Sequence, residues 1–159
     1  MLKTILILDD QSGCLNVFAL MLESRHFRVI KTDDYDTAIR SCDNGGIDLF
    51  ICDVQLGSAL SGTDAAKFVH ESCPDVPILF TSGTPLEAWP AHDFENLRAL
   101  LACRIDFLPK PFSIEALMGK TESLIDASAP LERFLERFER ADRVRRIRKP
   151  EEFSSVTAT

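Results

Sequence analysis

Five short apolar runs, separated by segments with helical spacing, constrain the fold of this chain more than any other feature. Their regular alternation with helical segments predicts a parallel sheet built from βαβ units. The first run lacks polar alternation, as expected of a strand that is covered on both faces. The five runs are Ile5–Leu8, Phe27–Ile30, Asp48–Cys52, Pro77–Phe80 and Ile105–Leu108.

The segments between these runs carry the apolar spacing and the caps of amphipathic helices. Asp34 and Ser113 are suited to accept the free N–H groups at the start of a helix. The stretch 83–104 is poorly patterned, and a helix is predicted there only from about Asp93 to Ala102. The sequence thus predicts five βα units in an α/β, doubly wound sandwich. One helical stripe, with the spacing i, i+3, i+4, i+7, consists of Leu15, Phe18, Ala19 and Leu22.

A break at 128–130 divides the chain into a main domain, residues 1–127, and a helical extension, residues 128–149. Residues 150–159 are expected to form a disordered tail. The apolar stripe of the added helix can pack on its own domain or pair with a second chain through residues 130–147. These two roles are favoured over phosphate binding by the helix arginines, because a charge run is usually a solvated face.

Composition limits the remaining choices of protein class. The 159 residues, 45% of them hydrophobic, suffice for one sizeable core. Residues 1–129 carry 10 basic and 19 acidic side chains, a net charge of −9, which argues against nucleic acid as a partner of the main domain. The widely spaced cysteines, and a start that offers neither a signal peptide nor a membrane-spanning helix, predict a soluble protein of the reducing cytoplasm.

Charged and hydroxyl side chains close four of the five apolar runs. In a parallel sheet the carboxyl ends of the strands face one crevice, so these groups are expected to converge there. Carboxylates, a hydroxyl and an ammonium group are together suited to binding a divalent cation and to accepting a phosphoryl group on a carboxylate. The residues concerned are Asp9, Asp10, Asp53, Thr81 and Lys110.

The order of these motifs resembles the receiver domain of two-component response regulators, over about residues 3–126. The resemblance implies a flavodoxin-like fold with strand order 2-1-3-4-5. It implies a signalling module rather than an enzyme, which takes a phosphoryl group from a sensor histidine kinase or a phosphotransfer protein and changes conformation to alter a protein–protein interaction. The motifs that carry it are Asp9-Asp10, Asp53, Thr81-Ser82-Gly83 and Phe107 to Phe112.

The resemblance also assigns a phosphoacceptor and a metal site. Asp53 would accept the phosphoryl group. Mg²⁺ would be bound directly by Asp10 and Asp53, mostly through water by Asp9, and by the backbone carbonyl of Gln55. Clustered carboxylates repel one another unless a hard cation binds them, which agrees with this assignment.

Three further roles follow from the same resemblance. Thr81 and Lys110 would bind the phosphoryl group, where Lys110 neutralises its charge. Thr81 and Phe107 would act as the conformational switch, with Phe107 standing where a tyrosine is frequent. The Lys110–Pro111 peptide bond is expected to be cis.

Two features depart from the family pattern. Gly57 stands in the loop after Asp53 where a proline is usual, and the segment between Thr81 and Lys110 is long, with Thr84 to Pro90 as the expected insert. We expect Trp89, the single tryptophan, to lie near the crevice and to respond to phosphorylation.

Two other functions remain open from the sequence. One is a pseudo-receiver, an interaction module that never takes phosphate. The other is an aspartyl-phosphate hydrolase of the haloacid dehalogenase type, which uses a similar set of groups. That family needs a second aspartate two residues after the nucleophile, and Gln55 occupies this position.

Overall fold

A parallel sheet forms the centre of the protein in a computed structural model that describes residues 1–126 and 131–153. The strand order is β2-β1-β3-β4-β5, which confirms the predicted doubly wound, flavodoxin-like fold. Each strand lies within two residues of its predicted bounds, since apolar runs of this kind are stable only when both faces are covered. The strands are β1 (Thr4–Leu8), β2 (Arg28–Thr32), β3 (Leu49–Asp53), β4 (Ile78–Ser82) and β5 (Ile105–Pro109).

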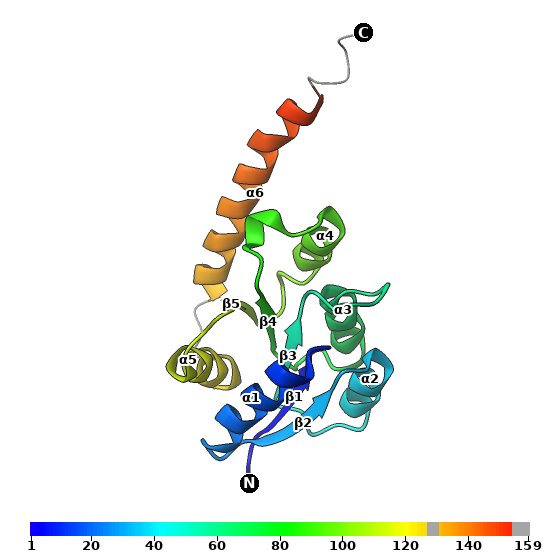
Figure 1. The fold of residues 1–159 in the computed structure, drawn as a ribbon, viewed down its shortest axis with the longest axis vertical. Coiled ribbons are helices and arrows are strands. Elements are labelled where there is room, and N and C mark those ends of the chain that lie inside the picture. Colours follow the sequence, from blue (N-terminus) through cyan, green and yellow to red (C-terminus); the bar gives the residue numbers. More distant parts are fainter. Residues whose placement is uncertain (127–130, 154–159) are drawn as a thin grey trace.

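Helices cover both faces of the sheet (Figure 1). α1 and α5 lie on one face, over a core that includes Ile5, Ile7 and Leu79. α2, α3 and α4 lie on the other face, over a core that includes Phe50 and Phe80. The helices are α1 (Ser12–Glu23), α2 (Tyr35–Asp43), α3 (Gly62–Ser72), α4 (Ala91–Ala99) and α5 (Ile114–Ile125).

Side-chain caps fix where several helices begin. The Asp34 carboxylate accepts a hydrogen bond from the backbone N–H of Thr37, and the Ser113 hydroxyl accepts one from Ala116. Both predicted caps are thereby confirmed. At the start of α3, Ser61 and Asp64 form a reciprocal capping box, which holds this helix end directly after the loop that follows β3.

The poorly patterned segment after β4 contains two short helices. A 3₁₀ helix, η1 (Leu86–Ala88), occupies the expected insert and leads into α4. The predicted helix at Asp93 to Ala102 exists, but it begins two residues earlier and ends three residues earlier than expected. It ends because the backbone of Leu100 leaves the helical range, with φ of −97° and ψ of 1°.

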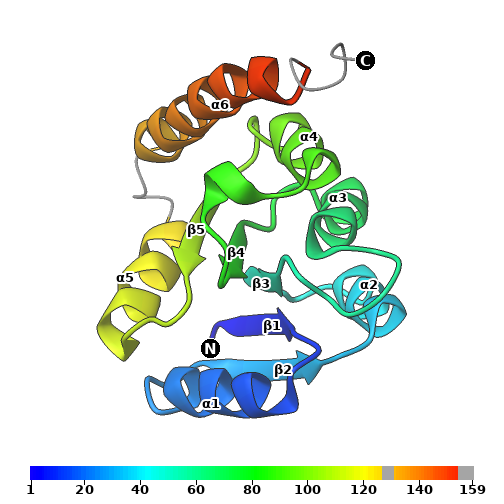
Figure 2. The same ribbon diagram turned by 45° about the horizontal axis from the view of Figure 1, so that its top comes forward.

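The added helix, α6 (Leu131–Phe153), packs on its own domain, which was one of its expected roles. Phe134, Phe138 and Ala141 are buried in the same core as α4, and the ring of Phe138 stacks on Phe94 at 4.6 Å between centroids. α6 runs past η1 and α4 along the β5 edge of the sheet (Figures 1 and 2). It continues four residues beyond the expected end at 149, while 128–130 and 154–159 lie outside the described residues.

The cysteines and the helices bear on two smaller expectations, free thiols and the lack of a membrane-spanning helix. The five cysteines are free thiols, of which three are buried. In the described ranges, none of the helices has the length and apolar character needed to cross a membrane.

Candidate functional site

The register of the sheet brings the sequence-predicted polar residues to one edge. Asp53 at the end of β3 pairs with Thr81 in β4, and Ser82 pairs with Pro109, the residue before Lys110. β1 lies on the other side of β3, and Asp9 follows its last residue directly. The strand ends of β1, β3, β4 and β5 therefore meet as predicted, because parallel strands present the same ends to the same side.

Lys110 bridges two of the three carboxylates at this edge. Its Nζ lies 2.9 Å from Oδ2 of Asp9 and 3.4 Å from Oδ2 of Asp53. Its backbone N–H donates to the carbonyl of Ser82 at 2.8 Å, which fixes the position from which the side chain departs. The Lys110–Pro111 peptide bond is cis, as expected.

The carboxylates of Asp9, Asp10 and Asp53 lie close enough to share one cation. One oxygen from each lies within 4.8 Å of the others. Asp9 and Asp53 are buried, whereas Asp10 is exposed and faces solvent at the mouth of the cluster. Backbone N–H groups orient all three, from Gln11 to Asp9 at 2.9 Å, from Gly57 to Asp10 at 2.7 Å and from Gln55 to Asp53 at 3.4 Å.

The pKa of the Asp53 carboxyl is raised to about 6, chiefly by burial and in smaller part by the charge of Asp9, against the lowering effect of Lys110. Burial alone would lower the pKa of Lys110, but the hydrogen bond to Asp9 and the charge of Asp53 raise it above its ordinary value. The site thus concentrates negative charge that one lysine offsets only in part. Such an arrangement favours binding of an additional cation.

The hydroxyl of Thr81 is buried and makes no hydrogen bond to any described residue. A buried hydroxyl without a partner is costly, and it can form a hydrogen bond with a ligand that enters the site. Thr81 pairs in register with Asp53, so its hydroxyl belongs to the same strand-end edge as the carboxylates. The chain therefore supplies carboxylates, an ammonium and an available hydroxyl together.

Phe107 lies away from the carboxylates, in a cluster on the side of η1. Its side chain is buried, and its ring meets that of Trp89 edge to face at 5.3 Å. Trp89 also packs on Phe80, the residue before Thr81, and donates from Nε1 to the carbonyl of Thr84. Trp89 therefore contacts the neighbour of Thr81 in β4 and does not contact Thr81 through a hydrogen bond. Its response to phosphorylation stays a prediction.

Sequence reasoning missed three features of the site. The N–H of Gly57 binds Asp10, which a proline at this position would be unable to do. Gln55 Nε2 donates to the hydroxyl of Thr84 at 2.8 Å and joins the loops after β3 and β4. A Cβ at Gly62 would lie 1.9 Å from the carbonyl oxygen of Asp53, so this glycine allows α3 to begin against the end of β3. The sequence shows the glycine at position 62, but its contact with the end of β3 appears only in the fold.

The sequence model of the response regulator receiver domain family matches residues 5–122. The chain belongs to this family. Receiver domains are signalling modules of two-component systems, and the strand order and the acidic cluster agree with that membership. Membership confirms the resemblance inferred from the motifs.

Characterised relatives are themselves response regulators. The receiver is 28% identical over 125 residues to the nisin biosynthesis regulatory protein NisR of Lactococcus lactis, covering 79% of this chain and 51% of that protein. It is 28% identical over 131 residues to the transcriptional regulatory protein TrcR of Mycobacterium tuberculosis, covering 81% of this chain and 48% of that one. The chain therefore spans about half the length of these relatives.

Solved receiver structures share the fold. A CheY-like response regulator receiver domain protein from Methanospirillum hungatei superposes with a TM-score of 0.68 at 23% sequence identity. The match covers 80% of this chain and 96% of that chain. The family model ends at residue 122, so α6 (Leu131–Phe153) lies outside the matched domain.

Proposed function

We propose that the protein is a phosphoacceptor, which takes a phosphoryl group onto Asp53 from the phosphohistidine of a sensor histidine kinase or a phosphotransfer protein. A carboxylate oxygen of Asp53 bonds to phosphorus while the N–P bond of the phosphohistidine breaks, and the electron pair stays on the imidazole nitrogen. The observation that carries the proposal is the contact of Lys110 with both Asp9 and Asp53, beside the available hydroxyl of Thr81.

Asp9, Asp10, Asp53 and the backbone carbonyl of Gln55 would hold Mg²⁺. The cluster fits this ion, because Mg²⁺ takes a few carboxylates together with waters and phosphate oxygens. When bound, the ion neutralises charge on the transferred group and on the acceptor. It would also hold Asp53 ionised, against the burial that raises its pKa to about 6.

Lys110 and Thr81 would bind the phosphoryl oxygens. The ammonium of Lys110 already lies 3.4 Å from the Asp53 carboxylate, so it needs little movement to meet an oxygen added there. The Thr81 hydroxyl would gain the hydrogen-bond partner that it lacks among the described residues. Stabilisation of developing charge by groups already in position is the main contribution a protein makes to phosphoryl transfer.

A switch through Thr81 and Phe107 would carry the signal to a protein partner. Movement of Thr81 toward the phosphoryl group would act on Phe80 and Trp89, and the ring of Phe107 contacts Trp89 directly. We therefore expect the η1 region to change when Asp53 is phosphorylated.

The phosphohistidine donor must enter the mouth of the crevice to reach Asp53, which is buried. An apolar cavity of about 320 Å³ beside Lys110, between α1 and the segment that follows β5, provides a surface for it. Val17 and Leu20 add exposed apolar area on α1, with exposed fractions of 48% and 67%. An exposed apolar patch at the rim of a reactive site is typical of a protein interface.

Two expectations on partners and compartment stay predictions. A homodimer through residues 130–147 would have to use the exposed side of α6, because Phe134, Phe138 and Ala141 are buried in their own domain. The cytoplasmic location stays a prediction that rests on the sequence.

The deciding experiment combines a small phosphodonor with Mg²⁺ and measures the intact mass of the protein. We expect the wild type to gain one phosphoryl group and Asp53→Ala to gain none. A wild type that is never modified would establish the pseudo-receiver. Sustained turnover of small phosphate esters would instead establish the haloacid dehalogenase-type hydrolase.

A further inference from the structure

α6 binds the end of η1 through a single arginine. The guanidinium of Arg145 donates hydrogen bonds to the backbone carbonyls of Glu87 and Trp89. It also lies over the ring of Phe94, 4.3 Å from the centroid, so one side chain joins α6 to both η1 and α4. Hydrogen bonds from a charged donor are stronger than neutral ones and fix the geometry of the carbonyls that accept them.

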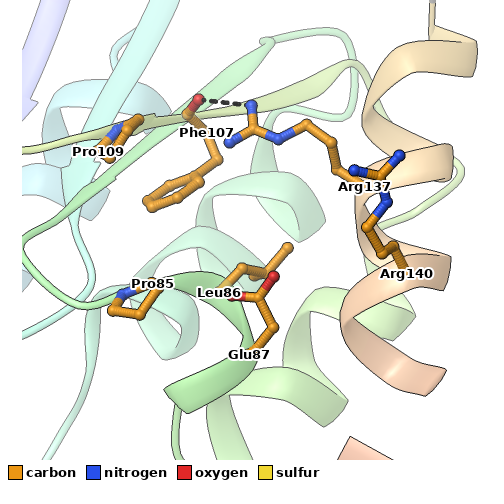
Figure 3. A pocket seen from close by; sticks show the side chains of 7 residues that line it. All are labelled: Pro85, Leu86, Glu87, Phe107, Pro109, Arg137 and Arg140. Atoms are coloured by element: carbon orange, nitrogen blue, oxygen red, sulfur yellow. Dashed lines mark hydrogen bonds between the residues drawn. The ribbon is translucent and has the colours of Figure 1, made fainter. Parts of the chain in front are cut away.

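A second arginine, Arg137, joins α6 to β5 at Phe107. Its guanidinium donates to the carbonyl of Phe107 at 3.4 Å (Figure 3) and lies 5.4 Å from the centroid of that ring. It is also 3.8 Å from the carboxylate of Asp106. Both arginines therefore contact segments that the proposed switch would have to move.

A cavity of about 230 Å³ lies between η1, β5 and α6, and Arg137 lines it. In Figure 3, the ring of Phe107 lies on one side of the cavity and Leu86 on the other, with Arg137 and Arg140 of α6 along the wall. The cavity leaves room for Phe107 or Leu86 to repack, so a second arrangement of this interface is sterically possible. Its lining is Pro85, Leu86, Glu87, Phe107, Pro109, Arg137 and Arg140.

The segments that α6 holds are direct continuations of the phosphoacceptor site. η1 begins five residues after Thr81, and Lys110 follows Phe107 by three residues. In the arrangement that α6 holds, the hydroxyl of Thr81 has no hydrogen-bond partner among the described residues. Engagement of that hydroxyl by a phosphoryl oxygen would draw the end of β4 away from this arrangement, and with it the carbonyls that Arg145 binds.

We propose that α6 is a built-in brake on the phosphoacceptor site. Docking of α6 holds η1 and β5 in an arrangement that disfavours a phosphoryl group on Asp53, and phosphorylation in turn weakens docking of α6. The two effects are equal in size, because a coupling free energy between two binding events is reciprocal. This inference rests on the proposed function and adds a regulator that lies within the chain.

The first test weakens α6 docking in the full-length chain and measures binding of a phosphoryl mimic. The variants are Arg137→Gln, Arg145→Gln and the double variant, with Arg143→Gln as a matched control because Arg143 is an exposed arginine of the same helix. Binding of trifluoroberyllate at saturating Mg²⁺ is measured by calorimetry. We expect the double variant to bind about 10-fold more tightly than the wild type, each single variant to lie between them, and the control to stay within about two-fold.

The second test measures the reverse effect in the wild type. Hydrogen exchange of the amides of residues 134–148 is followed with and without trifluoroberyllate and Mg²⁺. If α6 acts as proposed, its amides should exchange faster when the mimic is bound, because docking of α6 is then weaker.

The outcomes separate the two proposals. Equal or weaker binding by the double variant, or unchanged exchange of α6 in a wild type that binds the mimic, overturns the brake and leaves the phosphoacceptor function standing. A wild type that binds no mimic, together with no modification by a phosphodonor, overturns the proposed function and the brake with it. Circular dichroism of each variant verifies that its helices are retained.

Discussion

The strand-end crevice and the α6 interface are built in opposite ways. The crevice gathers carboxylates that one lysine offsets in part, raises the pKa of Asp53 to about 6 and leaves the hydroxyl of Thr81 without a partner among the described residues. The α6 interface buries Phe134 and Phe138 and directs its arginines to backbone carbonyls and aromatic rings.

This difference implies that the crevice lowers the stability of the fold and that the α6 interface raises it. Unbalanced charge and a buried polar group without a partner both cost folding free energy, and such costs are typical of sites that bind a ligand. Buried aromatic rings and satisfied arginines stabilise the fold. Substitutions in the two regions should therefore change stability in opposite directions, which the following predictions test.

The largest effect is expected in the α6 interface. Phe138→Ala removes a ring that is buried and stacked on Phe94, so the free energy of unfolding should fall by about 3–4 kcal/mol. Urea denaturation followed by circular dichroism measures the change. Ile147→Ala is the control on the same helix, because Ile147 is 74% exposed, and its effect should stay within about 0.5 kcal/mol. If Phe138→Ala unfolds at the same urea concentration as Ile147→Ala and the wild type, packing of Phe138 adds nothing to the stability of the core.

In the crevice, loss of the positive charge of Lys110 should lower the rate of phosphorylation. Lys110→Ala removes the ammonium that contacts Asp9 and Asp53, so the rate of phosphorylation by a small donor should fall about 100-fold. Lys3→Ala is a suitable control, because Lys3 is exposed and pairs with Asp48 far from the crevice. Phosphoprotein formation is measured over time by intact mass. A rate that Lys110→Ala leaves unchanged contradicts the role proposed for this residue.

Neutralising the phosphoacceptor should stabilise the fold. The pKa of Asp53 is raised to about 6 in the folded protein from 3.8, so the folded state binds a proton more tightly than the unfolded state. Stability therefore falls as pH rises through this window, and Asp53→Asn, which stays neutral, removes the decline. With a chelator present, Asp53→Asn should be more stable than the wild type by about 1–2 kcal/mol at pH 7, with solvent screening included.

The same stabilisation should vanish at pH 4, where the wild-type carboxyl is protonated in the fold. Asp75→Asn, in an exposed loop, controls for the loss of one negative charge. The comparison is made from urea midpoints at the two pH values. A destabilised Asp53→Asn at pH 7 would mean that the crevice is balanced without a cation and that the contrast between the two regions is wrong.

The sequence predicted the crevice better than the α6 interface for a physical reason. Asp53 ends β3, Thr81 is one residue from the end of β4 and Lys110 directly follows β5. Parallel topology alone brings such strand ends together. The positions of Arg137 and Arg145 depend on how α6 packs, which a helical stripe does not specify. The apolar stripe includes Phe134, Phe138 and Ala141, which are buried in the structure, but the spacing left both self-packing and pairing open.

Loops show the same limit at smaller scale. The irregular backbone around Trp89 has no periodicity, so its 3₁₀ turn and its contacts with Phe80 and Phe107 were unpredictable from sequence spacing. Gly57 was recognised as a departure from the family pattern, yet the hydrogen bond from its N–H to Asp10 depends on distances that only the folded loop supplies.

The smallest effect concerns that hydrogen bond and tests how closely the crevice is shaped for a cation. In Gly57→Ala the added Cβ would lie 2.9 Å from Oδ2 of Asp10, so the carboxylate at the end of this exposed side chain must shift while the N–H donor remains. Mg²⁺ affinity measured by calorimetry should fall about five-fold, less than the loss expected when a supporting donor is removed entirely. Gly13→Ala, where no atom lies within 4 Å of the added carbon, is the matched control. If both variants bind Mg²⁺ like the wild type, the exposed Asp10 adapts freely, and the specificity of the crevice then resides in its buried pair, Asp9 and Asp53.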